Sequence, residues 1–374
     1  MSQPVTCDSL VADEGHQSSI ASVLSDFLIP ALVAFGLSLI GGWGAIRFAV
    51  RLGFLDRPGT EAHKRQARAV PYGGGPVVAL ALVAAVLAGW LAGGDSAPPK
   101  EVWYLAGGAT VLLGLGLIDD LRPLGAGVKL AVQAAVAAAV VPLAGLEIDS
   151  FRGTSPLLAY GAAWAWLVLV TNAYNLIDHA DGYSGAIATV SATVLLSGAL
   201  LAGHPDEARL WLALIAALAG FLVWNLPPAR LYLGDAGSLP LGFLIGYGTL
   251  STTFWDSGTG GTQLAVLAPV LITAIPLFDT AVVVVKRWRR GQPLMRGDRN
   301  HLGHRLTRLG LSSRTGLACT IALQTALAAS ALQLRRDDWL AAAVTLGQAA
   351  AVLVALVLLE TTRDHGPQSN GPQA

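Results

Sequence analysis

Residues 156–182 read PLLAYGAAWAWLVLVTNAYNLIDHADG. A long apolar run is followed at once by four polar residues, Asn172, Asn175, Asp178 and Asp181. One helix needs roughly 20 predominantly apolar residues to cross the hydrocarbon core of a bilayer. Residues 156–176 reach that length, with Asn172 and Asn175 near their end. The run also lacks the period-2 alternation of a membrane β-barrel strand. The stretch therefore predicts a transmembrane helix with a polar group at one end.

The same pattern recurs along the whole chain, which is 53% hydrophobic and only 13% charged. A soluble domain usually has about 25% charged residues. We predict an all-α, polytopic integral membrane protein with about 10–11 transmembrane helices. The expected spans are 27–50, 74–94, 101–121, 128–146, 156–176, 185–203, 208–226, 238–254, 264–286, 315–334 and 337–360.

The two ends of the chain are polar and are expected to be disordered tails. Residues 1–22 lack the basic segment that begins a signal peptide, and residues 361–374 follow the last apolar run. Residues 23–360 are then a single transmembrane domain. The two cysteines, Cys7 and Cys319, lie in unrelated contexts and indicate neither a disulfide framework nor a metal cluster.

Five breaks between the apolar runs contain most of the interesting polar residues. They read HKRQARAVPYGGG from His63, GLIDD ending at Asp120, NAYNLIDHADG from Asn172, YLGDAGS from Tyr232 and RGDRNHLGHRL from Arg296. Because they fall in alternate gaps, we expect all five on one side of the membrane. Eighteen of the 24 lysines and arginines lie in or beside these gaps. The positive-inside rule then places this side in the cytoplasm.

Asp119 and Asp120 end one apolar run. Adjacent carboxylates repel each other, so a pair at a membrane edge calls for a compensating cation or a shared proton. A solvated helix end is the simpler alternative. Lys129 begins the next run and is placed to reach a phosphate, although a lysine there also suits an interface anchor.

The four polar residues of NAYNLIDHADG are each three apart. If the helix continues through them, Asn172, Asn175, Asp178 and Asp181 share one slowly drifting face. Such oxygen ligands suit a hard cation, Mg²⁺ or alternatively Mn²⁺. Gly182 would end the helix or let a ligand approach closely. Polar packing inside a helix bundle is the alternative.

Two glycine-rich stretches lie at expected helix starts. In YLGDAGS, Asp235 lies between two glycines, and Ser238 is expected to cap the following helix, whose N-terminus would favour a phosphate. PYGGG at residues 71–75 offers backbone N–H groups that could hold a phosphate. A capping turn and a flexible turn are the respective alternatives.

The last break contains Arg299, His301, His304 and Arg305, residue types that suit recognition of a pyrophosphate or a sugar. A solvated basic loop is the alternative. Zinc is disfavoured because no cysteine accompanies the histidines. Asp279 lies within an apolar run, so it must face the interior of the bundle.

Taken in order, these motifs resemble those of the polyprenyl-phosphate N-acetylhexosamine-1-phosphate transferases, from about residue 25 to about residue 360. The matching segments are DRP at 56–58 with VPYGGG, IDD at 118–120, NAYNLID with DG at 181–182, LGDAGS at 233–238, PLFDT at 276–280 and DRNHLGHRL at 298–306. Each motif alone is modest, whereas the ordered set is specific.

The resemblance implies that a polyprenyl phosphate attacks the β-phosphate of a UDP-sugar, with Mg²⁺, and releases UMP. The partners implied are a UDP-sugar, undecaprenyl phosphate and the lipid bilayer of the bacterial inner membrane, with no nucleic acid; a homodimer is also expected. The site residues implied are Asp119, Asp120, Asp178 and Asp181 as catalytic, Lys129, Asn172, Arg299, His301, His304 and Arg305 as substrate-binding, and Asn175 and Asp235 as metal ligands.

Three departures from the family pattern stand out. Gly303 occupies a position where hexosamine members usually have histidine, and His179–Ala180 replace a usual Gly–Leu. The segment between His63 and Pro71 is also longer than is typical. We expect the region around Gly303 to decide the sugar preference.

Two alternative functions remain at this stage. One is the phospho-muramoyl-pentapeptide transferase reaction, which the absence of a triple-histidine signature disfavours against an N-acetylhexosamine such as N-acetylglucosamine. The other is a membrane transporter, which would place its ionisable residues near the midplane and often has repeated halves. Here the polar residues gather at one face, and the sequence has no evident internal repeat.

Overall fold

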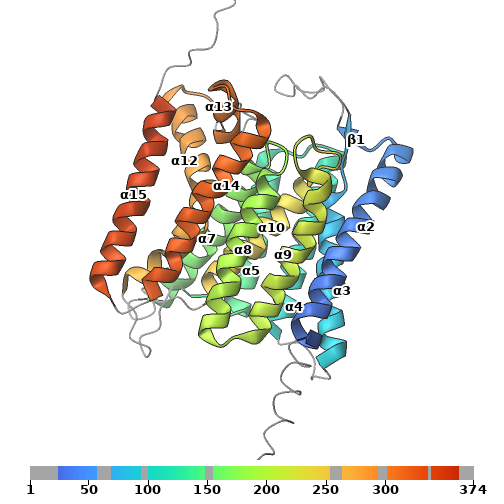
Figure 1. The fold of residues 1–374 in the computed structure, drawn as a ribbon, viewed down its shortest axis with the longest axis horizontal. Coiled ribbons are helices and arrows are strands. Elements are labelled where there is room, and N and C mark those ends of the chain that lie inside the picture. Colours follow the sequence, from blue (N-terminus) through green and yellow to red (C-terminus); the bar gives the residue numbers. More distant parts are fainter. Residues whose placement is uncertain are drawn as a thin grey trace, which may run out of the picture.

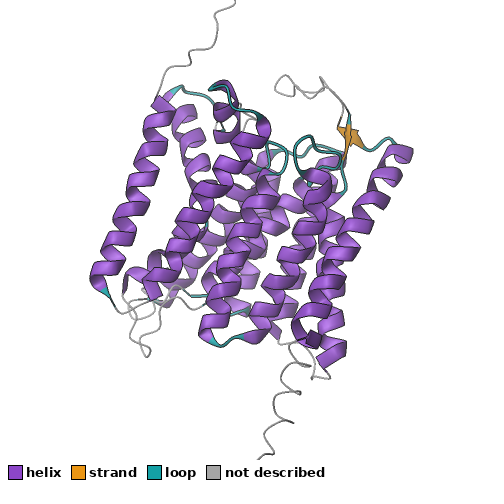
Figure 2. Ribbon diagram, viewed as in Figure 1, coloured by secondary structure: helices purple, strands orange, loops and turns teal. Residues whose placement is uncertain are grey.

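The computed structural model describes residues 24–56, 69–93, 100–147, 155–252, 263–293, 301–335 and 338–361. Long helices run roughly alongside one another and form one bundle (Figures 1 and 2). The helices are η1 (Leu24–Leu28), α2 (Ile29–Leu52), α3 (Gly74–Gly93), α4 (Lys100–Leu121), α5 (Ala126–Leu143), α7 (Pro156–Ile177), α8 (Tyr183–Ala202), α9 (Pro205–Asn225), α10 (Asp235–Ser251), η2 (Gln263–Leu267), α11 (Ala268–Ile272), α12 (Ala274–Arg289), α13 (Leu302–Arg308), α14 (Ser313–Ser330), η3 (Ala331–Arg335) and α15 (Trp339–Thr361).

The prediction of an all-α polytopic membrane protein is confirmed. Within the described residues, nine helices are long and apolar enough to cross a membrane, and the bent pair formed by α11 and α12 would make ten. Helix α10 has 17 residues, and every residue from Ala236 to Thr249 is buried. It packs against α3, α4, α7 and α8, so it is the central helix of the bundle.

One predicted span, 264–286, is wrong as a single helix. The chain bends by 75° between Leu264–Ile272 and Ala274–Arg289. A break of this kind frees backbone groups, which cost several kcal/mol if left unpaired away from water. Gln324 of α14 pairs with two of them: its Nε2 donates to the carbonyl of Ile272 at 2.6 Å, and its Oε1 accepts from the amide of Ile275 at 3.1 Å.

Among the residues that the structure describes, the sheet content is a single pair of short strands at one end of the bundle. β1 (Leu55–Asp56) pairs antiparallel with β2 (Val70–Pro71). β1 and α13 lie at the same end of the bundle in Figure 1. The expected tails lie outside the described residues except for Thr361, and so do residues 63–68, including His63.

Candidate active site

The start of α10 is held by a carboxylate from another helix. The residue before α10, Gly234, has φ 71° and no side chain to cap the helix. Asp120 at the end of α4 supplies the cap, because its Oδ1 accepts from the amide of Asp235 at 2.9 Å and its Oδ2 from the amide of Ala236 at 3.1 Å. A carboxylate is stabilised at a helix N-terminus by these N–H groups and by the helix dipole. Asp120 thereby fixes α4 to α10.

Lys129 connects the two acidic motifs. Its ammonium lies 2.7 Å from Oδ2 of Asp235 and 3.1 Å from Oδ2 of Asp119. The other oxygen of Asp119 accepts from the amide of Leu124 at 2.7 Å. The side chains of Lys129, Asp119 and Asp235 are 14–23% exposed, so water screens the ion pairs only in part.

Asn175 lies beside the same group from α7. Its Nδ2 donates to Oδ1 of Asp235 and to Oγ of Ser238, at 2.9 Å each. Ser238 was expected to cap α10, and that expectation is wrong: it lies inside the first turn and accepts from Asn175 instead. The residues predicted as metal ligands, Asn175 and Asp235, are therefore in direct contact.

Asn172, one turn earlier, faces a different neighbour. Its Nδ2 donates to Oε1 of Gln133 on α5 and to the carbonyl of Val168. Gln133 is buried, and sequence reasoning did not single it out. The sequence did contain a signal for it: Gln133 is a lone glutamine within a span of alanine and valine, and an amide in an apolar helix needs a hydrogen-bond partner.

The expected continuous polar stripe along NAYNLIDHADG is wrong. Helix α7 ends at Ile177, with Asp178 as its C-cap, and α8 begins at Tyr183. Asp178 and Asp181 thus lie in the turn between the two helices. Gly182, with φ 80°, precedes α8 instead of ending α7. The helix thus ends before the third residue of the stripe, and two tight turns join it to α8: the amide of Asp178 donates to the carbonyl of Asn175, and that of Tyr183 to the carbonyl of Ala180.

Burial raises the pKa of both aspartates of this turn. Burial raises the pKa of Asp178 well above its usual range, and the charges of Asp235, Asp120 and Asp181 raise it further. Burial also raises the pKa of Asp181, although its Oδ2 accepts from the amide of Ala229 at 2.8 Å, which opposes the shift. The turn therefore adds two carboxyl groups to a region that already contains Asp119, Asp120 and Asp235.

Asp178→Asn is expected to stabilise the protein at neutral pH. A carboxyl with a raised pKa in the folded chain binds its proton more tightly there than in the unfolded chain. The contribution of this carboxyl to the free energy of unfolding is therefore most favourable below the unfolded pKa of about 4, and it is lost as the pH rises toward the folded pKa. Asparagine does not titrate, so the variant does not lose stability in this way as the pH rises. Thermal unfolding in EDTA should give a midpoint higher by a few degrees at pH 8, with a smaller gain at pH 5.

The matched control is Asp206→Asn, at an exposed position of α9 beside Arg209. This variant should show no gain at pH 8. An Asp178→Asn midpoint equal to or below that of the wild type at pH 8 would contradict the expected repulsion.

The PYGGG turn does not offer the free backbone donors that the phosphate interpretation required. The amide of Gly74 donates to the carbonyl of Tyr232, and that of Gly75 to the carbonyl of Leu233, at 2.9 and 3.0 Å. Tyr72 also forms a parallel bridge with Tyr232. This turn joins the first motif to YLGDAGS, so its role in the described structure is to position the start of α10.

The last motif forms a separate cluster around Asp279. Asp279 is 1% exposed and faces the interior, as expected. Its Oδ2 lies 2.7 Å from Nδ1 of His301, and its Oδ1 accepts from the amide of Leu302 at 2.6 Å. The ring of His179 stacks on that of His301, with centroids 4.2 Å apart, and His304 lies 5.0 Å from His179.

Of the two arginines of this motif, the structure describes only Arg305. Arg305 is buried, and its Nη2 donates to the carbonyl of Leu359 near the end of α15, at 3.1 Å. Arg299 lies outside the described residues. Their substrate-binding roles, and those of His301 and His304, stay predictions.

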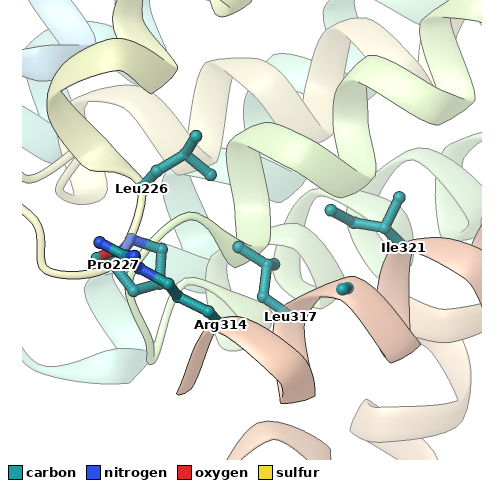
Figure 3. A pocket seen from close by; sticks show the side chains of 6 residues that line it. Leu226, Pro227, Arg314, Leu317 and Ile321 are labelled. Carbon is teal, nitrogen blue, oxygen red and sulfur yellow. The ribbon is translucent and has the colours of Figure 1, made fainter. Parts of the chain in front are cut away.

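An apolar pocket of about 350 Å³ lies between the end of α9 and α14 (Figure 3). It is lined by Leu226, Pro227, Arg314, Leu317, Ala318 and Ile321. Arg314 is its one charged lining residue, and its Nε donates to the carbonyl of Pro227 at 2.8 Å. The carboxylates described above do not line this pocket, so it is distinct from the acidic site.

Comparison with known proteins agrees with the site. Residues 102–253 match the model of glycosyl transferase family 4. A protein of Bacillus subtilis named as a probable undecaprenyl-phosphate N-acetylglucosaminyl 1-phosphate transferase is 32% identical over 303 residues, which cover 78% of this chain and 81% of the relative. The undecaprenyl-phosphate alpha-N-acetylglucosaminyl 1-phosphate transferase of Escherichia coli K12 is 29% identical, over 76% and 77% of the two chains.

The fold and the site thus define a polytopic membrane transferase. The chain belongs to the family of polyprenyl-phosphate N-acetylhexosamine-1-phosphate transferases, within glycosyl transferase family 4. A further relative, the decaprenyl-phosphate N-acetylglucosaminephosphotransferase of Mycobacterium leprae, is 29% identical over 54% of this chain and 57% of its own length. Membership of this family favours an enzyme over the transporter alternative.

Proposed function

We propose that this chain transfers N-acetylglucosamine-1-phosphate from UDP-N-acetylglucosamine to undecaprenyl phosphate. The observation that supports this most strongly is one connected polar group, built from four helices by hydrogen bonds and ion pairs. Its members are Asp119, Asp120, Lys129, Asn175 and Asp235. The names of the relatives supply the sugar and the lipid. An oxygen of the lipid phosphate forms a bond to the β-phosphorus of the donor, and the bond between that phosphorus and the bridging oxygen breaks to release UMP.

The donor set fits a hard divalent cation. The group contains the carboxylates of Asp119, Asp120 and Asp235 and one ammonium, so negative charge is in excess. Asp235 and Asn175 would hold Mg²⁺, or Mn²⁺ as the alternative ion, through oxygen atoms. When bound, such an ion neutralises the charge that develops on the phosphates.

The two adjacent aspartates are suited to different tasks. Both oxygens of Asp120 accept from backbone amides, so this carboxylate is the fixed member of the pair. Oδ2 of Asp119 is held by the ammonium of Lys129, which can exchange a carboxylate for a phosphate. We assign to Asp119 the orientation of the lipid phosphate and acceptance of its proton, and to Lys129 a contact with a phosphate oxygen.

The proposed orientation places the acidic site at the cytoplasmic face of the inner membrane, where UDP-sugars occur. The support is the basic-residue asymmetry along the sequence together with the contacts among four motifs at one end of the bundle. A cysteine introduced at Arg230 for labelling in intact cells and in inverted vesicles tests this: only the vesicles should react.

The proposed reaction predicts metal-dependent release of UMP by the purified protein. With UDP-N-acetylglucosamine and undecaprenyl phosphate, EDTA should lower the rate to that of the blank, and added Mg²⁺ should restore it. The assay is run against a panel of UDP-sugars that includes UDP-muramoyl-pentapeptide, and the lipid product is identified by mass. If every donor gives only the blank rate while a known family enzyme works in parallel, the proposal fails.

A further inference from the structure

Gly303 lies directly against two aromatic side chains. A Cβ atom added at this position would meet Nε2 of His179 at 2.9 Å and Cζ of Tyr183 at 2.7 Å. Contacts this short do not occur for real side chains without movement of a neighbour. Any residue larger than glycine at position 303 must therefore displace both His179 and Tyr183.

The hydrogen bonding of His179 determines what its ring can do. Nδ1 lies 3.3 Å from the carbonyl of Leu176, and because a carbonyl only accepts, Nδ1 carries the proton. Nε2 then carries a lone pair; it is buried and has no hydrogen-bond partner among the described residues. Burial lowers the pKa of His179 well below its usual range, and His301 and His304 lower it further, so the ring is neutral. A neutral ring can stack closely on a second imidazole without charge repulsion.

The ring of His301 is fixed on two sides. Asp279 holds its edge through Nδ1 at 2.7 Å, and His179 covers its face with an interplanar angle of 15°. His301 is only 4% exposed, so its ring is enclosed by protein and has little room to rotate. The carboxylate and the stacked ring together determine where Nε2 of His301 points.

We propose that His179 is a positioning residue that holds His301 toward the diphosphate of the sugar donor, and that the absence of a side chain at Gly303 leaves room for the ring of His179. This rests on the proposed function, because His301 is the residue expected to contact that diphosphate. The two departures noted in the sequence, at positions 179 and 303, are then one feature: the space left by the missing side chain contains the imidazole of His179.

A metal site at the same residues is less consistent with the geometry. Donor atoms of His179, Asp279 and His301 lie within 4.8 Å of one another. The two rings, however, are stacked almost in parallel, so their lone pairs do not converge on one point. The oxygens of Asp279 are engaged by His301 and by the amide of Leu302. An aligned histidine pair accounts for all of these contacts.

The test uses single and double variants of the full-length protein. His179→Ala should raise KM for the UDP-sugar about tenfold, the upper range for an aromatic pair, while kcat changes by less than about threefold. KM for undecaprenyl phosphate should stay within about twofold of the wild-type value. His179→Phe, which keeps an aromatic face on His301 without the ring nitrogens, should recover most of the lost affinity.

Gly303→Ala should raise KM for the UDP-sugar in the same way, because its Cβ displaces His179. The double variant His179→Ala/Gly303→Ala should be no worse than the more impaired single variant. The matched controls are His204→Ala, at the loop before α9, and Gly347→Ala, where a Cβ would meet nothing within 4 Å. Both controls should behave as the wild type.

Three outcomes would overturn the pairing. The first is that the rises in KM of the two single variants multiply in the double variant. The second is that His179→Phe raises KM for the UDP-sugar as much as His179→Ala does. The third is that KM rises equally for both substrates. Calorimetric titration with UDP-N-acetylglucosamine separates this inference from the proposed reaction. If the donor binds but no UMP is released, the reaction fails alone and the affinities of the variants still decide the role of His179. If the wild type binds no UDP-sugar, both fail.

Discussion

Asp235→Asn and Asp119→Asn are each expected to lower turnover by about 10³-fold while the protein still inserts and folds. Asp235 is in contact with Lys129 and Asn175, so its carboxylate is central to the acidic site. Asparagine keeps the shape and removes the charge that a cation and the transferred phosphate require. UMP release by purified protein measures the effect.

Size-exclusion profile and thermal unfolding establish that each variant is folded. Asp206→Asn, at an exposed position of α9, is the matched control and should retain the wild-type rate. A rate within about tenfold of the wild type in either Asp235→Asn or Asp119→Asn would contradict the role assigned to that residue.

Gly116→Ala should impair the site without touching any of its side chains. A Cβ on Gly116 would overlap the backbone of Asp235 and Ala236, where α4 approaches the start of α10. Helix α4 must then move away, and the two amide hydrogen bonds to Asp120 weaken. We expect kcat/KM to fall about 100-fold, as for a displacement of about 1 Å at a reacting centre.

Stability should fall as well, by about 1–3 kcal/mol, the usual effect of overpacking. Gly114→Ala is the control on the same helix, since a Cβ at Gly114 would meet nothing within 4 Å. Its activity and unfolding should match the wild type. If Gly116→Ala were equally neutral, the close approach of α4 to α10 would not be what aligns Asp120.

The convergence of the motifs could be predicted because hydrophobic periodicity and length decide where a membrane helix ends. Once Asp120, Asn175 and Asp235 were each assigned to a helix end on one side, their meeting required only that the helices pack together. The contact between Asn175 and Asp235 follows from this packing of helix ends. So is the inward orientation of Asp279, because lipid does not tolerate a charged side chain.

What could not be predicted depends partly on local turns and mostly on tertiary contacts between segments distant in sequence. The end of α7 at Ile177 is set by local turns that the three-residue spacing did not reveal. The amides of Gly74 and Gly75 are taken by Tyr232 and Leu233, more than a hundred residues away. Gly116 looked like an ordinary member of an apolar helix, since its importance comes from the neighbouring backbone of Asp235 and Ala236. An amide at Gln133 indicated a polar partner, but the sequence did not identify that partner as Asn172.

Lys129 has a further consequence for the order of events at the acidic site. Its ammonium occupies the space between Asp119 and Asp235 and neutralises part of their repulsion when no other cation is bound. A cation that binds at Asp235 must compete with this tethered charge. An anionic substrate gives the ammonium another partner and so removes the competition. Because linkage is reciprocal, the affinities of metal and phosphate at this site should rise together.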